Sequence, residues 1–495
     1  MDLKKLLVNV EHNFLHGCDA EITGLSIDSR EVAPGDLFFC IKGLTHDSHL
    51  FAADAVKRGA AAVVAERPFD ACDACGANEA FGVPVVLVGS SRKALGRMAS
   101  NFYGDPACGM NLIGVTGTNG KTSVTYYLES ILNAAGRKPG VVGTMKARAL
   151  GGEIDVKYKT STTPDTPELM KILTAMRDAG ATDVCIEVTS HSLALYKVDG
   201  LRFKAGVFTN LTQDHLDFHG TMEDYKAAKK RLFALCETGV TNADDAAAKE
   251  MTDGAGCGVL TYGIYSDCDI RAADIEYDAY GARFTAALYG EELRFYVSAP
   301  VKFAVYNALA AIAAAVVLDI PAGHISDGLK NFSGVPGRFQ RVPNDAGVTV
   351  VVDYAHTPDG LKNVLGSARE LCGGRLICVF GCGGDRDKSK RREMGRIAGE
   401  LSDHVFVTSD NPRSEEPMDI IKEIEKGVLE TGRPYEIYED RKAAIYAAVA
   451  RAKRGDTVVV AGKGHEEYQE FKNRTVRFVD AEVAADALLE ARATA

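Results

Sequence analysis

The sequence lacks several features that mark whole classes of proteins. It has no excess of basic residues, because 57 Lys and Arg stand against 68 Asp and Glu, for a net charge of −11. Proteins whose main partner is a nucleic-acid backbone usually carry a basic surface, so we expect no nucleic-acid partner. The composition, with 46% apolar and 25% charged residues, excludes a disordered, collagen-like or coiled-coil chain.

Long apolar segments are also missing. The longest uninterrupted apolar run covers the eleven residues 308–318, whereas a membrane-spanning helix needs about 20. We expect a buried helix at this run. The first residues, MDLKKLLVNVEHNF, lack the apolar core and the small-residue cleavage site of a signal peptide. These absences together predict a soluble, cytoplasmic protein without a membrane span.

The cysteines do not form an obvious framework. Twelve are scattered along the chain, and Cys40, Cys185 and Cys378 lie in apolar, strand-like runs. That pattern favours buried free thiols over disulfides. Cys72 and Cys75 form one C-x-x-C motif, but no second pair at zinc spacing accompanies it. We therefore interpret this pair as part of an Ala-rich surface loop.

Three segments follow one another along the chain. Dividing 495 residues by about 150 per domain gives roughly three domains. Turn-rich clusters at 103–106 and 333–337 place the predicted domains at 1–107, 108–335 and 336–495. Strand-like runs alternate with helical patterns in the last two segments. We therefore predict an α/β protein with a P-loop-type central domain on a mainly parallel sheet and a Rossmann-like C-terminal domain.

The strongest local motif is G-V-T-G-T-N-G-K-T at 114–122, between an apolar strand and a helical pattern. Small residues let backbone N–H groups surround phosphate oxygens, and a helix N-terminus favours their negative charge. Lys121 would reach the outer phosphates, and the Thr122 hydroxyl would ligate Mg²⁺. The strict pattern has glycine five residues before Gly120, where this chain has Val115, but the context still favours a phosphate-binding loop.

Acidic and histidine residues follow further strands of the same segment. Glu187 ends a predicted strand, where parallel sheets bind ligands, and a carboxylate there suits Mg²⁺. The segment 209–219 carries two Asp and two His, which could hold a second metal or orient a nucleophile; its spacing matches no standard zinc pattern. Lys229 lies on a helix predicted over 222–235. By itself, Lys229 is one of four basic residues on a solvated helix face.

These motifs resemble those of the Mur ligases, the ATP-dependent amino-acid ligases of peptidoglycan precursor synthesis. The resemblance covers nearly the whole chain. The segments that carry it are Asp28–Arg30, Gly117–Thr122, Thr162–Pro164, Glu187–His191, Asp214–Asp217, Tyr306–Ala311, Pro336–Arg338, Asp353–His356, Gly383–Asp387, Asp410–Arg413 and Gly462–Glu466. The resemblance implies a monomeric enzyme that acts on small molecules, with ATP as co-substrate and Mg²⁺ as cofactor.

The resemblance also implies roles for residues around the nucleotide. The implied ATP contacts are Gly117, Thr118, Asn119, Gly120, Lys121, Thr122, Asn307, Arg338 and Asp353. The implied catalytic residues are Lys121, Glu187, His215 and Lys229. The implied metal ligands are Thr122, Glu187, His215 and Lys229, the last as a carbamylated N6-carboxylysine. A carbamate turns the lysine cation into an anion that can bridge Mg²⁺ near the γ-phosphate, so the resemblance reverses our interpretation of Lys229.

The first two domains would bind a UDP-sugar peptide. The implied contacts are Ser29, Leu44, Thr45, His46, Thr162, Thr163, Thr189 and Lys197. Two positions depart from the family, which often has Arg in place of Lys197 and Gln in place of Leu195. A lysine cannot copy the two-pronged contact of an arginine, so we expect this contact to differ from the family pattern.

The implied reaction begins when ATP phosphorylates the D-Glu carboxylate of UDP-N-acetylmuramoyl-L-alanyl-D-glutamate (UDP-MurNAc-L-Ala-D-Glu), and an amine then attacks the acyl phosphate. The amine belongs to meso-diaminopimelate or to L-lysine, which lacks the distal carboxylate. Recognition of that carboxylate calls for the N–H fork of an arginine, and Arg386 and Arg413 follow predicted strands at the ligand-binding edge. We therefore predict meso-diaminopimelate. The predicted contacts are Arg386, Asp410, Asn411, Pro412, Arg413, Gly462 and Glu466, with Glu466 on the distal ammonium.

Two alternatives stay open at this point. One is the same ligase with L-lysine as the amino acid. The other is a nucleotide-binding relative without ligase activity, although the amino-acid residues of the third segment favour the enzyme. A ligase that adds glutamate to folates would share the phosphate loop and the overall fold, but it would have no reason to carry Asp-Ser-Arg at 28–30.

Overall fold

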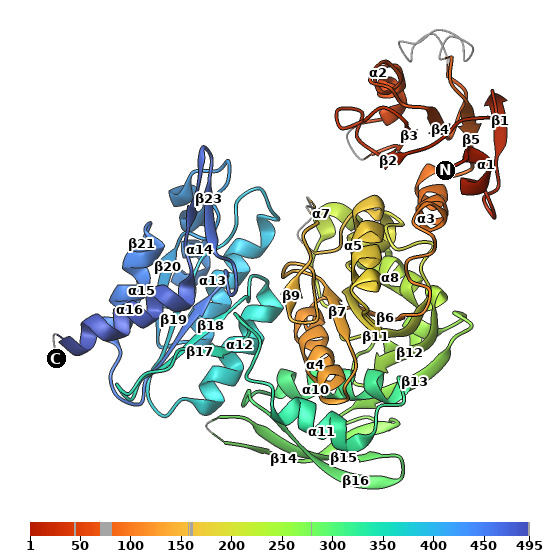
Figure 1. The fold of residues 1–495 in the computed structure, drawn as a ribbon. Helices are drawn as coiled ribbons and strands as arrows, with labels where there is room; N and C mark the ends of the chain where they lie inside the picture. The colour runs from red at the N-terminus through yellow and green to blue at the C-terminus, as the bar shows by residue number, and fades with distance from the viewer. Residues whose placement is uncertain (44–45, 70–81, 157, 159–161, 279, 494–495) are drawn as a thin grey trace.

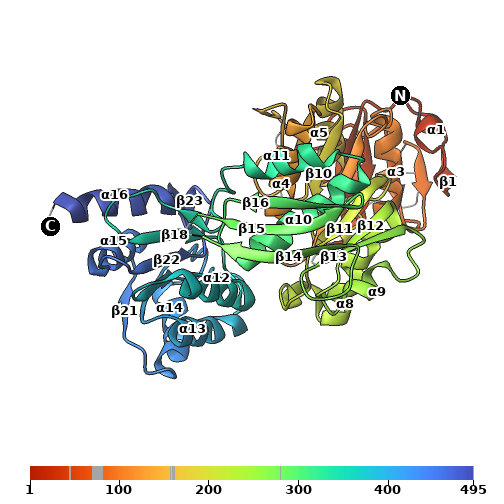
Figure 2. The same cartoon turned by 90° about the horizontal axis from the view of Figure 1, so that it is seen from below.

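The computed structural model describes all residues except 44–45, 70–81, 157, 159–161, 279 and 494–495. Figure 1 shows three α/β lobes that follow one another along the chain, and Figure 2 shows the same order from below. This confirms the predicted α/β class with three domains, while the exact boundaries at 107 and 335 stay a prediction. Within the described residues, no helix is both long and apolar enough to cross a membrane.

The first lobe is a five-stranded sheet in the order β1-β5-β4-β3-β2. Its strands are β1 (Asn13–His16), β2 (Gly24–Ser26), β3 (Asp36–Phe39), β4 (Ala62–Ala65) and β5 (Val85–Leu87). Its helices are α1 (Leu3–Leu6), the 3-10 turn η1 (Ser48–Phe51), α2 (Ala52–Lys57) and α3 (Ser91–Phe102). The strands are parallel except β1. Strands β3 and β4 are buried along their whole length because separate apolar clusters cover both faces of the sheet.

The central lobe has an eleven-stranded sheet in the order β16-β15-β14-β13-β12-β11-β6-β10-β7-β8-β9. Strands β7, β10, β6, β11, β12, β13 and β14 run parallel. The sheet continues through antiparallel pairings to β15 and β16 at one end and to β8 and β9 at the other. The strands are β6 (Asn111–Thr116), β7 (Pro139–Val142), β8 (Arg148–Ala149), β9 (Gly152–Glu153), β10 (Asp183–Glu187), β11 (Phe203–Phe208), β12 (Cys236–Asn242), β13 (Gly258–Gly263), β14 (Ile270–Tyr277), β15 (Ala282–Leu288) and β16 (Glu291–Val297).

The helices of the central lobe confirm one prediction and correct another. They are α4 (Lys121–Ala134), α5 (Thr166–Asp178), α6 (Ser190–Ala194), α7 (Leu216–His219), α8 (Met222–Lys230), η4 (Arg231–Leu235), α9 (Ala248–Thr252), α10 (Lys302–Val317) and α11 (Ala322–Lys330). The apolar run 308–318 lies in buried helix α10, as predicted. The sequence predicts a helix over 222–235, but the α-helix ends at Lys230 and the chain continues as the 3-10 turn η4. Strand β12 begins directly after η4, at Cys236, and the tighter turn leads the chain into that strand.

The third lobe has a six-stranded sheet in the order β17-β18-β22-β19-β20-β21, in which only β17 is antiparallel. The strands, with the hairpin β23–β24, are β17 (Gln340–Arg341), β18 (Thr349–Asp353), β19 (Leu376–Phe380), β20 (His404–Thr408), β21 (Tyr435–Tyr438), β22 (Thr457–Ala461), β23 (Tyr468–Phe471) and β24 (Arg474–Arg477). The helices are α12 (Pro358–Leu371), α13 (Ser389–Leu401), α14 (Pro417–Leu429), α15 (Arg441–Arg451) and α16 (Asp480–Ala493).

The layered arrangement places the motifs together. Carboxyl ends of parallel strands meet at one edge of a sheet, where α/β proteins bind ligands. Most of the motif segments named above follow such a strand in the central or the third lobe. Cys40, Cys185 and Cys378 are buried free thiols, as predicted, whereas Cys72 and Cys75 lie outside the described residues.

Candidate active site

The phosphate loop joins β6 to α4. Val115 is fully buried and still belongs to β6, so the departure from the strict motif lies in the strand and the turn begins at Gly117. Gly120 precedes α4 with a left-handed φ of +90°, and a Cβ there would collide with the Asn307 side chain. Lys121 donates from Nζ to the carbonyls of Gly117 and Thr118, both at 2.8 Å. The loop is therefore closed on its own lysine.

Residues after β11 hold the loop in shape. The backbone N–H of Asn119 donates to Asn210 Oδ1 at 2.9 Å, and that of Thr118 donates to the Asn210 carbonyl at 2.9 Å. Thr209 Oγ1 donates to the Asn119 carbonyl at 2.6 Å. Sequence reasoning missed Thr209 and Asn210 as part of the site, although they follow a parallel strand that ends beside the loop. The loop is preorganised because these contacts do not depend on a ligand.

Glu187 lies at the end of β10, next to the loop, and is 1% exposed. Its Oε2 accepts hydrogen bonds from Thr122 Oγ1 at 3.0 Å and from Thr144 Oγ1 at 2.9 Å, and its Oε1 accepts one from the Thr144 N–H at 3.0 Å. Thr163 Oγ1 donates to the Glu187 carbonyl at 2.8 Å. The predicted pair of Thr122 and Glu187 is thus in direct contact.

The other two threonines of the predicted UDP-sugar set lie in the same neighbourhood. Thr162 Oγ1 is 3.3 Å from Thr144 Oγ1, and Thr189 Oγ1 is 3.3 Å from Thr163 Oγ1. A substrate that reached these hydroxyls would bring its reacting end close to Glu187.

Lys229 is 1% exposed, so its interpretation as part of a solvated helix face is wrong. Helix α8 packs this face inward, and Lys229 Nζ lies 4.4 Å from the centre of the Tyr225 ring. Burial lowers the pKa of Lys229 well below its usual range, the nearby Lys121 charge lowers it further, and Asp214 opposes the shift. Tyr225 also ties this helix to the phosphate loop, because its hydroxyl is 3.1 Å from Thr118 Oγ1.

His215 lies beside Lys229 in a cluster of rings. Its ring centre is 4.8 Å from that of His191. Its Nε2 is 3.4 Å from Asp214 Oδ2. Burial lowers the pKa of His215 to about 3, although Asp214 acts in the opposite direction, so this imidazole is neutral at pH 7. Among the described residues, no group of three or more His, Cys, Asp or Glu side chains is arranged to hold a metal ion. The option of a separate metal site in 209–219 has no support.

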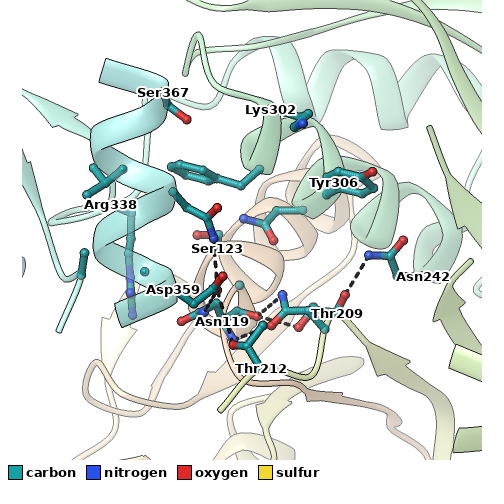
Figure 3. A pocket seen from close by; sticks show the side chains of 18 of the residues that line it. Asn119, Ser123, Thr209, Thr212, Asn242, Lys302, Tyr306, Arg338, Asp359 and Ser367 are labelled. Carbon is teal, nitrogen blue, oxygen red and sulfur yellow. Dashed lines mark hydrogen bonds between the residues drawn. The ribbon is translucent and has the colours of Figure 1, made fainter. Parts of the chain in front are cut away.

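A cavity of about 340 Å³ lies where the central and C-terminal lobes meet. The predicted nucleotide residues that line it are Asn119, Gly120, Asn307, Arg338 and Asp353. Figure 3 shows Asp359 of α12 pointing toward the loop, where its Oδ2 accepts from Asn119 Nδ2 at 3.2 Å and from Thr212 Oγ1 at 3.4 Å. Sequence reasoning missed Asp359, which gives the C-terminal lobe a direct contact with the phosphate loop.

Two predicted nucleotide residues form one wall of this cavity. The Arg338 guanidinium lies 4.5 Å from the centre of the Tyr354 ring. Asp353 accepts backbone hydrogen bonds from Phe339 at 2.6 Å and Ala355 at 2.9 Å, and burial raises its pKa. Asp353 therefore stabilises the turn that carries Arg338.

A second, larger cavity of about 1650 Å³ lies between the first and central lobes. Ser29 and His46 line it, as does Asp165, which pairs with Lys197 Nζ at 2.7 Å. Lys197 is 9% exposed, whereas the Asp165 side chain is half-buried, so Lys197 is linked to the cavity wall through its ion pair with Asp165. The predicted residues Leu44 and Thr45 lie outside the described residues.

The predicted amino-acid residues gather after β19, β20 and β22. Arg413 Nη1 donates to the Gly384 carbonyl at 2.8 Å, and Arg413 Nε is 3.3 Å from Glu470 Oε2. Asn411 Nδ2 donates to Glu466 Oε2 at 2.8 Å. Arg386 is exposed in the Gly-rich turn after β19.

Three further residues of the predicted amino-acid set, Asp410, Pro412 and Gly462, are in close contact with neighbouring loops. A Cβ at Gly384 would collide with the Pro412 carbonyl, and one at Gly462 would lie 2.6 Å from Asp410 Oδ2. Sequence reasoning missed Lys463 and Glu470, which contact Asn411, Glu466 and Arg413 directly. Lys463 lies within the motif Gly462–Glu466, so its position in the sequence could have signalled it.

This geometry defines a three-lobed α/β nucleotide-binding protein, and comparison with known proteins gives the family. The sequence model of the Mur ligase family catalytic domain matches residues 21–103, that of the Mur ligase middle domain matches 115–315, and that of the glutamate ligase domain matches 337–464. The chain belongs to the Mur ligase family, an ATP-dependent family of ligases that form peptide bonds.

Within the family, this chain is similar to UDP-N-acetylmuramoyl-L-alanyl-D-glutamate--2,6-diaminopimelate ligases. The protein of that name from Halalkalibacterium halodurans is 44% identical over 485 residues, 97% of each chain. The one from Bacillus velezensis is 43% identical over 99% of this chain and 98% of its own. A solved structure with that title aligns at a TM-score of 0.67 and 32% identity over 95% of both chains.

The fold is shared more widely. The MurF ligase from Thermotoga maritima, solved in complex with ADP, aligns at a TM-score of 0.59 with 19% identity, over 95% of this chain and 98% of its own.

Proposed function

We propose that this chain is the ATP-dependent ligase that joins meso-diaminopimelate to the D-Glu carboxylate of UDP-MurNAc-L-Ala-D-Glu. One observation carries the proposal: over 97% of its length the chain is 44% identical to a ligase of that name. In support of it, the phosphate loop lines a cavity between two lobes, and Thr122 at the end of that loop donates a hydrogen bond to Glu187. The cytoplasmic location, the monomeric state and the absence of a nucleic-acid partner stay predictions.

ATP would occupy the cavity between the central and C-terminal lobes. Asn307, Arg338 and Asp353 would contact its adenine and ribose, and the loop N–H groups would bind its phosphates at the N-terminus of α4. Lys121 would exchange its two carbonyl acceptors for the outer phosphates. Its charge would then offset the charge that develops on the transferring phosphoryl group.

The residues beside the loop fit Mg²⁺. Thr122 and Glu187 offer oxygen donors 3.0 Å apart, and Mg²⁺ is commonly bound by one or two carboxylates together with substrate phosphates. When bound, Mg²⁺ would neutralise charge on the phosphates. Lys229 fits the same site, because a neutral buried amine can add to CO₂, lose a proton and become a carbamate with two oxygens. Neutral His215 would orient groups near the carbamate.

The UDP-sugar peptide would occupy the larger cavity between the first and central lobes. From there its D-Glu carboxylate would reach Glu187 and the phosphate loop. Ser29 and His46 would contact the UDP end, while Thr162, Thr163 and Thr189 would contact the peptide end. The carboxylate takes the γ-phosphoryl group of ATP and becomes an acyl phosphate. The amine of the amino acid then attacks the carbonyl carbon, and phosphate leaves.

The C-terminal lobe would choose the amino acid. Arg413 would bind the distal carboxylate of meso-diaminopimelate, and Arg386 would add a second positive charge. Glu466 would accept the distal ammonium. The contacts of Asp410, Asn411, Pro412 and Gly462 shape the turn that presents these groups.

The test is an assay of phosphate release with ATP, Mg²⁺ and UDP-MurNAc-L-Ala-D-Glu, with meso-diaminopimelate in one reaction and L-lysine in another. Mass spectrometry would identify the tripeptide product. We expect turnover with meso-diaminopimelate alone. Turnover with L-lysine alone would keep the ligase and refute the role of Arg413, whereas no turnover with either would favour a non-catalytic relative.

A further inference from the structure

Lys463 carries a positive charge into the interior of the C-terminal lobe. Its side chain is 0% exposed and follows β22 by two residues. Its Nζ lies 2.9 Å from Asn411 Oδ1 and 2.9 Å from Glu466 Oε2, donating to both. A buried ammonium is costly unless it is paired and hydrogen-bonded. The two contacts therefore account for the burial of this lysine.

These contacts join two loops that the sheet keeps apart. Asn411 follows β20 and Lys463 follows β22, and β19 lies between those strands. Strands that are not neighbours in this way are about 10 Å apart, so the long lysine side chain is needed to connect the two loops. Gly462, with a φ of +119°, allows the approach, because any Cβ would lie 2.6 Å from Asp410 Oδ2.

The lysine also sets the orientation of its partners. Asn411 Oδ1 accepts from Lys463 Nζ and from the Glu470 N–H at 3.0 Å, so the Asn411 amide has one favoured orientation and donates from Nδ2 to Glu466. Both donors to the Glu466 carboxylate bind Oε2. Among the described residues, this arrangement leaves Glu466 Oε1 for a ligand.

The same network reaches Arg413. The Arg413 N–H donates to the Glu470 carbonyl at 3.1 Å, and the Arg413 guanidinium pairs with the Glu470 carboxylate. Glu470 in turn is bound to Asn411 through its own N–H. Arg413, which would bind the distal carboxylate of the amino acid, and Glu466, which would bind its distal ammonium, are thus connected through Asn411.

We propose that Lys463 is a positioning residue of the amino-acid site: its ammonium holds Asn411 and Glu466 together, so that Glu466 presents Oε1 to the distal ammonium of the bound amino acid. The inference rests on the proposed function, since Glu466 has this role only in a ligase that binds meso-diaminopimelate. It predicts that Lys463 affects the binding of the amino acid but not that of ATP or of UDP-MurNAc-L-Ala-D-Glu.

The first test is Lys463→Met, which keeps an unbranched side chain and removes the donor. We expect the KM for meso-diaminopimelate to rise about tenfold, because a lost hydrogen bond to a charged group corresponds to at least that factor. The KM values for ATP and for UDP-MurNAc-L-Ala-D-Glu stay at their wild-type values, as does kcat. Lys463 Nζ lies 5.5 Å from the centre of the Tyr468 ring. The matched control is Lys442→Met, because Lys442 Nζ likewise lies 5.3 Å from the centre of the Tyr446 ring but Lys442 is exposed.

A double-mutant cycle separates positioning from general damage. If Lys463 acts through Glu466, the combined variant K463M/E466Q raises the KM for meso-diaminopimelate by less than the product of the two single effects. The inference would be overturned if the KM increase in the double variant equalled the product of the two single increases. An unchanged KM for meso-diaminopimelate in K463M would overturn it as well. If K463M does not fold, the cycle is run with Lys463→Gln, whose amide keeps a donor and for which we expect a smaller KM increase. Wild-type protein without meso-diaminopimelate turnover would instead overturn the proposed function.

Discussion

Two lysines of this protein are buried to almost the same degree in opposite surroundings. Lys463 is 0% exposed and hydrogen-bonds to Glu466 and Asn411. Lys229 is 1% exposed and, in the part of the chain that the structure describes, its Nζ has a tyrosine ring but no carboxylate within ion-pair distance. The first lysine lies in the proposed amino-acid site and the second beside the phosphate loop.

The difference shows how the same residue type serves two purposes. A buried ammonium with a counter-charge organises the side chains around it. A buried lysine without one loses its proton more easily, and a neutral amine is a nucleophile that can react with CO₂. Burial alone therefore does not define the role of a lysine; the partner does.

The largest expected effect is from Lys229→Met. We expect phosphate release to fall about 10³-fold, because the proposed carbamate can no longer offset charge in the transition state. The measurement is kcat under saturating substrates. Lys226→Met is the matched control on the same helix. Lys226 forms an ion pair with Glu250, in which Nζ lies 2.6 Å from Oε2. Activity of K229M close to that of the wild type would contradict the role of Lys229.

The next largest effect is expected from Glu187→Gln, which tests the proposed Mg²⁺ site beside the phosphate loop. We expect kcat to fall about 10²-fold and the Mg²⁺ concentration for half-maximal activity to rise, because a carboxylate near the phosphates is lost. Chelation with EDTA should abolish wild-type turnover and added Mg²⁺ should restore it. Glu153→Gln, an exposed partner of Lys146, should change neither value. The same Mg²⁺ dependence in E187Q and wild type would refute the assignment.

Arg413→Ala tests the proposed amino-acid site, to which Lys463 also belongs. We expect the KM for meso-diaminopimelate to rise about 10- to 100-fold, since a charge-assisted, two-pronged contact is removed. Steady-state kinetics with meso-diaminopimelate would measure the change, with the KM for ATP unaffected. Arg474→Ala on the exposed strand β24 is the control. A KM for meso-diaminopimelate that is the same in R413A and wild type would contradict the role of Arg413.

The smallest effect concerns two half-buried histidines, His356 and His465. Burial lowers the pKa of His465 to about 3 and that of His356 to about 4. In the unfolded chain these groups titrate near 6.5, so the unfolded state binds more protons between about pH 4 and 6.5. Stability therefore falls as the pH falls through this window.

We expect the thermal midpoint to fall by about 2–4 °C for each kcal/mol lost between pH 7 and pH 5. His465→Gln should reduce that fall, because glutamine does not titrate. Thermal unfolding at both pH values measures the difference, and the exposed His324→Gln is the control. An equal fall in H465Q and wild type would contradict the assignment to His465.

Sequence reasoning found the phosphate loop because its function depends on consecutive backbone groups. The structure brings many of the predicted ligand residues to the ends of strands, because the carboxyl ends of parallel strands meet at one edge; their roles as ligands stay predictions. Sequence reasoning missed Thr209 and Asn210, which support the loop from another strand, and Asp359, which reaches the loop from the third lobe. Those contacts join residues about 90 or more positions apart, so no local pattern shows them.

The amino-acid sequence by itself determined the α/β class, the phosphate loop and the family, since these depend on alternation of apolar runs and on short contiguous motifs. Only the tertiary structure decided what surrounds each lysine. On the sequence, Lys229 is one basic residue in a basic helix and Lys463 one residue in a glycine-rich turn. Packing buries both, and the presence or absence of a carboxylate at the end of the side chain separates a structural cation from a reactive amine, because charge in a low-dielectric interior needs a partner.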